Sequence, residues 1–372
     1  MPDNRKIRVL EIVPAMNVDS GVASFCMNYL RKMDHNKYIV DFALFKLHDT
    51  PYYDEIKKLG GTIYLLPDIT SPLKHIKKCS EILNLGKYDV IHNNALTKSL
   101  PMMWCAKIHN IPVRILHSHN ASLGDSKHKV FQSKIVLTLL KKLATNYFSC
   151  SDAAGKCYFD SQPYLLVPNV IEEEKFKFDR ALRERVRLEM GLKKKTVICT
   201  VGRLAAQKNP YFALDVIKAL SQKYGDLEFL WVGTGSIEPD VREYTHFLGL
   251  DNIVSFLGAR KDMVEIYHAI DIFFLPSLFE GLPVTAVEAQ AMGLPSVISD
   301  TVTKELVYTD LVEFVPLDAP VDAWIKVLEK QMKRIPARRS YTKELENSVF
   351  SIKNAGHRLE SLYEKMLEQA QS

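Results

Sequence analysis

The sequence has no long hydrophobic run and no paired cysteine motif, and both absences exclude whole classes of protein. No uncharged apolar segment approaches the roughly 20 residues that a membrane-spanning helix needs, and the N-terminus lacks the apolar segment of a secretory signal peptide. The six cysteines form no Cys-x-x-Cys pair. We therefore expect a cytoplasmic protein whose free thiols are mostly buried, at Cys26, Cys79, Cys105, Cys150, Cys157 and Cys199.

Three ligand-binding motifs are also missing. The complete Gly-x-Gly-x-x-Gly signature of nicotinamide enzymes is absent, and so is the Gly-x-x-x-x-Gly-Lys loop of nucleotide hydrolases. No Asp-x-Asp pair is available to hold Mg²⁺ or Mn²⁺ on a diphosphate, so we expect neither a metal nor a cofactor. The net charge of +5 is too small to indicate nucleic-acid binding, but it suits an anionic substrate or an anionic membrane surface.

A chain of 372 residues, of which 47% are hydrophobic, is expected to form two domains. Short β-branched runs alternate with amphipathic stretches, which is typical of a doubly wound, parallel α/β sheet. The pattern stops at a charged connector, residues 171–195, and then restarts. We place one domain at residues 1–170, a second at 171–350 and a final helical segment at 351–372. Ligands of such sheets bind at the carboxyl ends of the strands, so the expected site is the cleft between the domains.

The segment TVGRLAAQKNP carries two cations where a strand passes into a helix. Gly202 permits a close backbone approach, and Arg203 and Lys208 lie five residues apart on the loop. Cations beside a helix N-terminus can bind a diphosphate. The alternative is an ordinary surface loop that carries both. The later segment WVGTGS, with Gly233 and Gly235, is as typical of a tight turn as of a ligand loop.

The segment FEGLPVTAVEAQAMGLPSVISD contains two glutamates, Glu280 and Glu288, around a mostly apolar helix. Pro283 is typical of the first helical position, which puts Glu280 just ahead of the helix N-terminus, where negative charge is favoured. Glu288 lies one turn after Val284 on nearly the same stripe. Carboxylates accept hydrogen bonds from hydroxyls and free helix N–H groups bind anions, which suits a sugar nucleotide. A charge effect at the helix start plus one internal, hydrogen-bonded Glu explains the pattern equally well.

Two segments of the first half end strands with polar residues. In PAMNVDSGVASFCMNYL, Gly21 starts a helix whose N–H groups can meet a phosphate, and an Asp/Ser N-cap with a turn glycine is the alternative. In VRILHSHN, the period-two geometry of a strand puts His117 and His119 on one face at its carboxyl end. A metal site lacks a third ligand at convincing spacing, so these histidines are better explained as polar site residues.

Taken in order, these segments resemble retaining glycosyltransferases of family 4, which have the GT-B fold. The spacing of Glu280 and Glu288 is similar to the Glu-x7-Glu motif of that family, and SGVASFCMNYL, VRILHSHN, VGRLAAQKNP, FLWVGTGS and SVISDTVTKE follow in the family's order. The likeness extends over residues 7–316 and is greatest to enzymes of capsular and exopolysaccharide assembly. It implies two Rossmann-like domains, of which the first binds the acceptor and the second the nucleotide sugar, and a C-terminal helix that packs back on the first domain.

The resemblance also implies roles for single residues. Arg203 and Lys208 hold the donor diphosphate, Glu280 binds hydroxyls of the transferred sugar, and Glu288 binds those of the ribose. The active-site histidine corresponds to His119, with His117 as the alternate. Further donor contacts are implied for Gly21, Gly258, Arg260, Gly281, Leu282 and Pro283. Of these assignments, the phosphate contact of Gly21 has the weakest match to the family, which commonly has Gly-Gly where this chain has Ser20-Gly21.

Residues 127–148 are basic and apolar together, and they resemble the lipid-facing acceptor region of related enzymes. The alternative is a solvated lysine face on a core helix. The resemblance implies a cytoplasmic, metal-independent, retaining transferase, peripheral at the inner face of the membrane where that region binds lipid. Its donor is a UDP- or GDP-linked hexose, and its acceptor is lipid-linked or a saccharide. A GT-B-shaped epimerase or phosphorylase, or a non-catalytic sugar-nucleotide-binding protein, shares the same phosphate clamp.

Overall fold

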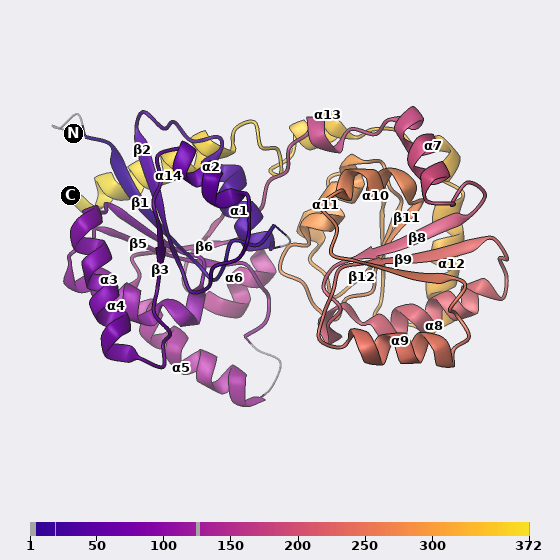
Figure 1. Ribbon diagram of the computed structural model, residues 1–372, viewed down its shortest axis with the longest axis horizontal. Helices are drawn as coiled ribbons and strands as arrows, with labels where there is room; N and C mark the ends of the chain where they lie inside the picture. Colours follow the sequence, from indigo (N-terminus) through magenta and orange to yellow (C-terminus); the bar gives the residue numbers. More distant parts are fainter. Residues whose placement is uncertain (1–4, 19, 124–126, 372) are drawn as a thin grey trace. The chain divides into compact units, whose positions relative to one another are not determined.

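The computed structural model describes residues 5–18, 20–123 and 127–371, and the chain folds into two compact units (Figure 1). Unit 1 comprises Met1–Val170 together with Ile352–Ser372, and unit 2 comprises Ile171–Ser351. The chain thus leaves unit 1 once and returns to it with its last helix. Each unit contains its own parallel sheet with helices on both faces.

Unit 1 is built on a seven-stranded parallel sheet with the order β3-β2-β1-β4-β5-β6-β7. The direction of winding reverses between β1 and β4, which makes this pair the topological switch point. The strands are β1 (Ile7–Val13), β2 (Tyr38–Leu44), β3 (Ile63–Leu65), β4 (Val90–Asn93), β5 (Val113–Ser118), β6 (Asn146–Ser149) and β7 (Leu165–Leu166).

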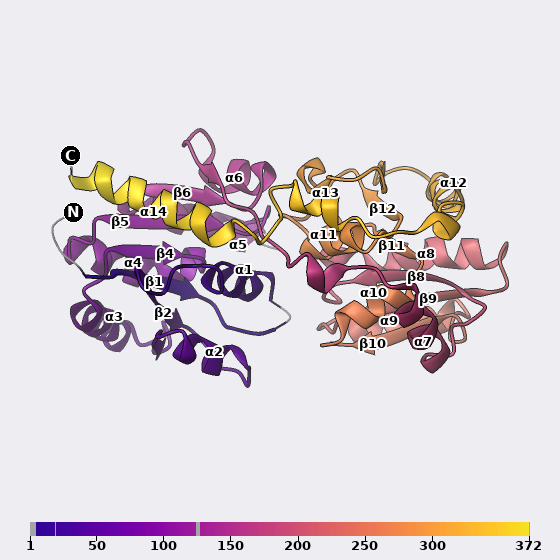
Figure 2. The same ribbon diagram turned by 90° about the horizontal axis from the view of Figure 1, so that it is seen from above.

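Two helical layers cover the sheet of unit 1, as the two views in Figures 1 and 2 show. One face packs against the helices α1 (Gly21–Leu30), α2 (Tyr52–Lys58) and α14 (Ala355–Gln371). The other face packs against α3 (Pro72–Gly86), α4 (Leu100–Ile108), α5 (Lys127–Leu143) and α6 (Asp152–Phe159). The prediction that the C-terminal helix returns to the first domain is confirmed, because α14 contacts α1 and β5.

Unit 2 has a six-stranded parallel sheet with the order β10-β9-β8-β11-β12-β13 and its switch point between β8 and β11. The strands are β8 (Thr196–Val201), β9 (Leu227–Val232), β10 (Val254–Gly258), β11 (Ile272–Leu275), β12 (Ser296–Ser299) and β13 (Val312–Val315). The helices are α7 (Arg180–Glu189), α8 (Pro210–Ser221), α9 (Glu238–Phe247), α10 (Met263–Ala269), α11 (Val284–Ala291), α12 (Val321–Met332) and α13 (Thr342–Glu346). Helices α8 and α12 contact each other over one apolar core, which includes the buried Trp231 and Trp324.

The charged connector predicted at residues 171–195 contains a helix, α7, that packs against α10. Arg183 and Arg187 lie one turn apart on α7, and both form ion pairs with the buried Asp271. Arg183 also donates to the carbonyl oxygens of His268 and Ile270 at the end of α10. The charges that made this segment look like a linker therefore attach it to the domain.

A second difference concerns the basic, apolar stretch at residues 127–148. The helix α5 ends at Leu143, and the chain then enters strand β6 at Asn146. The basic, apolar region at residues 127–148 is therefore a helix only in part, and no glycine or proline in the sequence marks where the helix ends.

The six cysteines are free thiols, and all but the half-buried Cys157 are buried. Across the described residues, none of the helices has both the length and the apolarity that crossing a membrane requires.

Candidate functional site

The loop after β8 carries Lys208 across the face of Gly202. The backbone of Gly202 has φ +156°, and a Cβ placed there would lie 2.5 Å from Lys208 Cε. Lys208 thereby reaches the segment after β11, where its Nζ lies 2.6 Å from Glu280 Oε1 in an ion pair whose side chains are 13% and 9% exposed. Because β8 and β11 are the strands at which the sheet order reverses, this pair lies at the switch point of unit 2.

Two further side chains hold the Glu280 carboxylate. Ser277 Oγ donates to Oε1 at 2.8 Å, and Gln207 Nε2 lies 3.3 Å from Oε2. Gln207 also donates to the Phe279 carbonyl at 2.9 Å and accepts from the Leu278 N–H at 2.8 Å. The two loops are thus joined by main-chain and side-chain hydrogen bonds. Sequence reasoning missed Ser277 and Gln207, because a lone Ser or Gln in a loop gives no spacing signal.

The glycines of WVGTGS allow a neighbouring loop to pack on this one. A Cβ at Gly233 would lie 2.2 Å from the Gly202 carbonyl oxygen, and one at Gly235 would lie 1.8 Å from the Leu204 carbonyl oxygen. The Leu204 N–H donates to the Thr234 carbonyl at 3.0 Å. Close backbone approach therefore explains both glycines without a ligand.

The remaining predicted cations of unit 2 lie on its surface. Arg203 is exposed, and the described residues include no recorded partner for its guanidinium. Arg260 forms an exposed ion pair with Asp262, with Nε 2.8 Å from Oδ1. Gly258 has φ +66°, and its carbonyl accepts from the Gly233 N–H at 2.8 Å. Arg203 is therefore a cation free to meet an anion, whereas Arg260 already has a carboxylate partner.

The turn residues Gly281, Leu282 and Pro283 are buried between β11 and α11. The prediction that Pro283 is the first helical residue is wrong by one position. Pro283 is the N-cap, with φ −72° and ψ 100°, and α11 begins at Val284. The extended ψ places Pro283 outside the helix, while its carbonyl already accepts a hydrogen bond from the Val287 N–H at 3.4 Å.

Glu288, on α11, has different partners from Glu280. Tyr267 on α10 donates to Glu288 Oε2 at 2.7 Å. Burial raises the pKa of Glu288 to about 7, while the Tyr267 hydrogen bond and the Lys175 charge act in the opposite direction. Glu288 therefore gains or loses its charge near neutral pH. The two glutamates are held by separate networks, an ion pair for Glu280 and a phenol for Glu288.

A buried arginine fixes the helix that carries Tyr267. Arg338 donates to the carbonyl oxygens of Met292, Ile270 and Tyr267 at 2.9, 2.7 and 2.7 Å. Its guanidinium also lies over the Phe178 ring, 4.3 Å from the centroid. These contacts satisfy carbonyls at the ends of α10 and α11, and so connect the two helices that position the Tyr267–Glu288 pair.

In unit 1, the carboxyl ends of β4 and β5 bring three histidine rings together. His92 Nε2 lies 3.0 Å from His117 Nδ1. The His117 and His119 rings are stacked, with centroids 4.0 Å apart, which confirms the prediction that they share a face. Burial lowers the pKa of both rings, to about 3 for His119, and the neighbouring histidines lower them further. Both rings are therefore neutral at physiological pH. Sequence reasoning missed His92, although HNN at a strand end offered the signal.

The His117 and His119 rings each use one nitrogen within the protein. His117 Nδ1 contacts His92, and His119 Nε2 lies 2.7 Å from Asn94 Oδ1. Within residues 5–18, 20–123 and 127–371, no group of three or more His, Cys, Asp or Glu side chains is arranged to hold a metal ion.

Gly21 is the first residue of α1, directly after the loop from β1. Ser20 is the N-cap, and its Oγ accepts from the Ala23 N–H at 3.4 Å. The Gly21 carbonyl accepts from Asn169 Nδ2 at 3.1 Å, and that Nδ2 is also the nearest atom, at 3.8 Å, to a Cβ placed on Gly21. The serine cap is thus observed, and among the residues that the structure describes no contact requires a glycine here. The phosphate contact of Gly21 stays a prediction.

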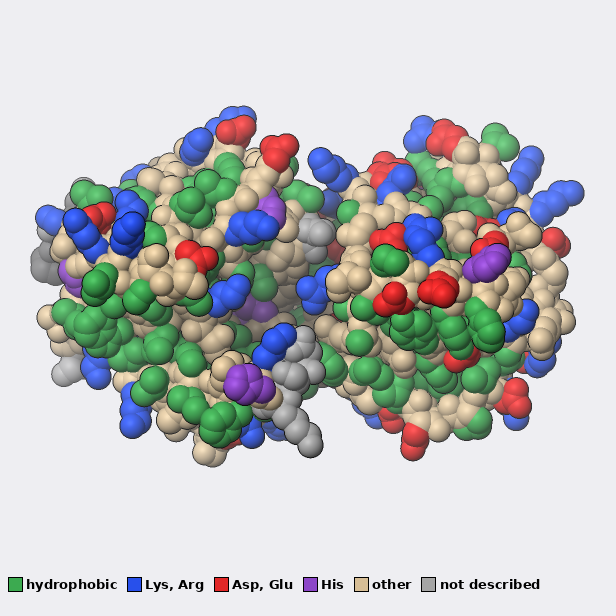
Figure 3. All heavy atoms as spheres, turned by 60° about the horizontal axis from the view of Figure 1, so that its bottom comes forward, with side chains coloured by type: hydrophobic (Ala, Val, Ile, Leu, Met, Phe, Trp, Pro, Cys, Tyr) green, Lys and Arg blue, Asp and Glu red, His purple; other side chains and the backbone are tan. Residues whose placement is uncertain are grey.

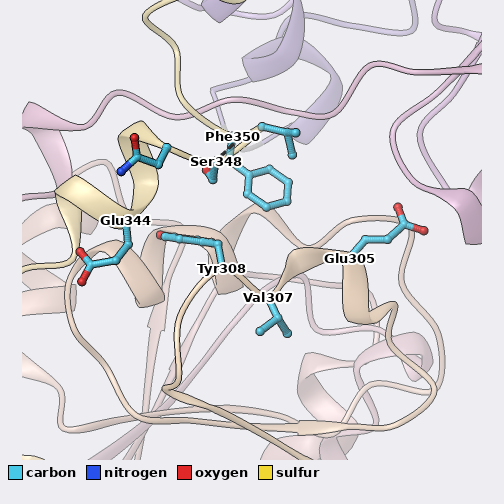
Figure 4. A pocket seen from close by; sticks show the side chains of 8 residues that line it. Glu305, Val307, Tyr308, Glu344, Ser348 and Phe350 are labelled. Carbon is cyan, nitrogen blue, oxygen red and sulfur yellow. Dashed lines mark hydrogen bonds between the residues drawn. The ribbon is translucent and has the colours of Figure 1, made fainter.

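A surface pocket of about 500 Å³ lies elsewhere in unit 2 (Figure 4). The rings of Tyr308 and Phe350 lie next to each other in its lining, tilted by 53° with centroids 5.8 Å apart, while Glu305 and Glu344 lie at its edges. None of the residues predicted for the site lines this pocket. Tyr308 does touch the helix of the site, because its hydroxyl donates to the Val287 carbonyl at 2.8 Å.

Comparison with known proteins shows what the chain is similar to. Residues 195–330 match the family described as glycosyl transferases group 1. The chain is 29% identical over 349 residues to a putative glycosyltransferase, EpsF, of Bacillus subtilis, with 91% of each chain covered. It is 26% identical over 347 residues to an Escherichia coli enzyme named UDP-Gal:alpha-D-GlcNAc-diphosphoundecaprenol alpha-1,3-galactosyltransferase, with 86% of each chain covered.

Solved structures show the same architecture. Anabaena HepE, solved in complex with UDP-glucose, superimposes with a TM-score of 0.80 at 15% identity, covering 96% of this chain and 100% of that one. WaaG, a glycosyltransferase involved in lipopolysaccharide biosynthesis, gives a TM-score of 0.70 at 15% identity, covering 97% and 99%. These likenesses establish the fold. The protein is a glycosyltransferase with the GT-B fold, and its residues 195–330 match the glycosyl transferases group 1 family.

Proposed function

We propose that this glycosyltransferase moves a hexose-type sugar from a nucleotide-diphosphate sugar to a hydroxyl of a lipid-linked or saccharide acceptor in polysaccharide assembly. The observation that carries the proposal is the Lys208–Glu280 pair at the switch point of unit 2, with Arg203, which has no recorded partner among the described residues, on the same loop. An ammonium joined to a carboxylate offers a cation for phosphate and an acceptor for sugar hydroxyls side by side. We assign the donor to unit 2 and the acceptor to unit 1.

The hydrogen-bonding capacity of the pair leaves room for a donor. The Lys208 ammonium has three protons and gives one to Glu280, so two remain for diphosphate oxygens. Glu280 Oε1 is occupied by Lys208 and Ser277, whereas Oε2 has only the long contact with Gln207 and can accept from a sugar hydroxyl. Glu288, held by Tyr267, binds the ribose hydroxyls in this proposal.

The reaction needs these residues for charge, and needs no protein nucleophile. The acceptor oxygen forms a bond to the anomeric carbon while the bond from that carbon to the diphosphate oxygen breaks, and the diphosphate leaves with the electron pair. Lys208 and Arg203 stabilise the growing negative charge, and these two cations take the place of a metal ion. The acceptor proton passes to the departing diphosphate on the same face of the sugar. Attack and departure on one face retain the anomeric configuration.

The test uses a matched pair of lysines. We expect Lys208→Met to lower transfer from a UDP- or GDP-hexose at least a hundredfold, because a charged group in the transition state is lost. Lys195→Met is the control: Lys195 forms an ion pair of the same 2.6 Å length with Glu228, at the opposite end of β8. Loss of activity in both variants, or in neither after correction for folded protein, would overturn the assignment. Uridine diphosphate appears in the names of the Escherichia coli relative and the HepE complex, so UDP-hexoses are tested first.

We also propose that unit 1 binds an anionic membrane surface through α5. Phe131, Ile135 and Leu139 lie four residues apart on α5 and are 63%, 51% and 46% exposed. Exposed apolar residues also lie on α4, which contacts α5, and on α3, which contacts α4: Trp104 and Ile108 on α4, and Leu73 and Leu85 on α3. Figure 3 shows hydrophobic side chains among lysines on this side of the unit. The sequence of α5 has no acidic residue, which suits anionic lipid headgroups.

Vesicle sedimentation tests this contact. We expect the protein to sediment with vesicles that contain phosphatidylglycerol and to remain in solution with pure phosphatidylcholine. The double substitution Phe131→Ser/Ile135→Ser should release it, whereas Phe247→Ser, at a 79% exposed phenylalanine of unit 2, should not. Equal sedimentation of the wild type and the double variant would remove α5 from the contact.

A further inference from the structure

One buried carboxylate lies behind the histidine rings of unit 1. Glu11, on β1, is 4% exposed. Its Oε1 lies 3.2 Å from His92 Nδ1 and 3.3 Å from the hydroxyl of Tyr363 on α14. Its Oε2 accepts a hydrogen bond from Asn94 Nδ2 at 2.5 Å. The carboxylate therefore has two arms, one toward His92 and one toward Asn94.

The contact of Glu11 with Asn94 determines which ring nitrogen of His119 carries the proton. A carboxylate only accepts hydrogen bonds, so the Asn94 amide must turn its NH₂ group toward Glu11 and its carbonyl toward His119. Asn94 Oδ1 lies 2.7 Å from His119 Nε2, and this contact requires a proton on Nε2. In the neutral ring, Nδ1 then carries a lone pair. This Nδ1 is buried and has no hydrogen-bond partner in the structure.

The contact of Glu11 with His92 determines which ring nitrogen of His92 carries the proton. The Tyr363 hydroxyl lies 2.7 Å from His92 Nδ1, so the phenol, the ring and Glu11 form a triangle. With a proton on Nδ1, His92 donates to the phenol oxygen and to Glu11, and the phenol donates to Glu11, so all three contacts are attractive. Without that proton, the Nδ1 lone pair faces the carboxylate at 3.2 Å, and the single phenol proton cannot serve both.

The position of the proton on His92 determines the position of the proton on His117. In neutral His92 with a proton on Nδ1, Nε2 accepts, so His117 Nδ1 must donate across the 3.0 Å contact. His117 Nε2 is then the bare nitrogen, and it too is buried without a hydrogen-bond partner. The edge of Phe25 packs against both rings, with centroids 4.7 and 4.9 Å away, and holds their planes.

We propose that Glu11 is a positioning residue that fixes the tautomers of His117 and His119, so that His117 Nε2 and His119 Nδ1 are the bare nitrogens of the two rings. A bare ring nitrogen accepts a hydrogen bond and cannot donate one. This effect of Glu11 on the rings is a property of the unliganded protein and does not depend on the proposed function.

Nitrogen-15 spectroscopy of histidine-labelled full-length protein tests the tautomers directly. We expect His119 protonated on Nε2 and His117 on Nδ1 at pH 7.5. The rival for His117 places its proton on Nε2, a state that an interaction with the Val167 backbone favours. A proton on His117 Nε2, or a doubly protonated His92, would overturn the first arm. A proton on His119 Nδ1 would overturn the second. The wild-type spectrum decides this without any variant.

The isosteric variant Glu11→Gln tests the cause. A glutamine offers one donor and one acceptor, so it cannot serve both arms, and one of the two rings should change tautomer. Asp41→Asn is the control: Asp41 is a buried carboxylate on the neighbouring strand and contacts Arg8 and Tyr88 instead. Unchanged tautomers in folded Glu11→Gln, or changed ones in Asp41→Asn, contradict the role of Glu11.

Discussion

Among single residues, Glu288 has a charge that depends on pH within the ordinary working range. Its pKa of about 7 results from burial, and Tyr267 donates to its carboxylate. Ribose hydroxyls bind the ionised form better, because a carboxylate accepts where a carboxylic acid partly donates. We expect donor affinity to fall about tenfold from pH 8 to pH 6, in line with the loss of ionised Glu288. Calorimetric titration with the donor at both pH values measures this.

Glu288→Gln is the matched control for that measurement. The amide keeps the size of the side chain and one acceptor, but it does not titrate, so the pH dependence of donor affinity should disappear in the variant. An equal dependence in the variant and the wild type would show that another group causes it.

Gly202 tests whether the position of Lys208 matters as well as its charge. A methyl group at residue 202 meets the Lys208 stem at 2.5 Å and moves the ammonium away from Glu280. Because a charge-assisted hydrogen bond contributes about 1.5–3 kcal/mol, Gly202→Ala should lower kcat/KM about 10- to 100-fold. Gly225→Ala is the control, since a Cβ there meets no atom within 4 Å. Equal activity of the two variants would mean that the ion pair has no part in transfer.

At the scale of elements, the seven-residue helix α10 is stabilised by the hydrogen bonds that Arg338 donates to the carbonyl oxygens of Tyr267 and Ile270. Arg338→Lys cannot reach the three carbonyls together, and an unsatisfied buried polar group costs about 1–3 kcal/mol. We expect a loss of at least about 3 kcal/mol in the free energy of unfolding, measured by urea titration. The neighbouring Arg339→Lys, at an exposed residue that pairs with Glu344, should change it by less than about 1 kcal/mol. Similar losses in both would contradict the anchoring role.

The main strands and the doubly wound class could be predicted from β-branched runs and their alternation with amphipathic stretches. Two boundaries could not. Residues 127–148 have one basic and apolar composition, and no breaker residue between Leu143 and Asn146 marks the end of α5 and the start of β6. The charges of α7 resemble those of a linker in the sequence, because the partner of Arg183 and Arg187, Asp271, lies more than 80 residues away.

At the scale of the whole molecule, each unit gathers polar residues at its own switch point, Lys208 and Glu280 in unit 2 and the histidines in unit 1. The sequence could predict Lys208, Glu280 and the His117–His119 pair, because strand ends and short spacings mark them. It could not predict Glu11, which reads as an ordinary strand residue until the topology places β1 beside β4.

The central claim is transfer of a hexose from a nucleotide-diphosphate sugar with retention, carried by Lys208 and Glu280. The most direct test incubates purified protein with a UDP-hexose and an undecaprenyl-diphosphate-linked sugar in the presence of a metal chelator, and assigns the anomeric configuration of the product by proton NMR. The account predicts a new glycosidic bond with the configuration of the donor, undiminished by the chelator and lost in Lys208→Met. An inverted product, or transfer that requires added metal, would contradict it.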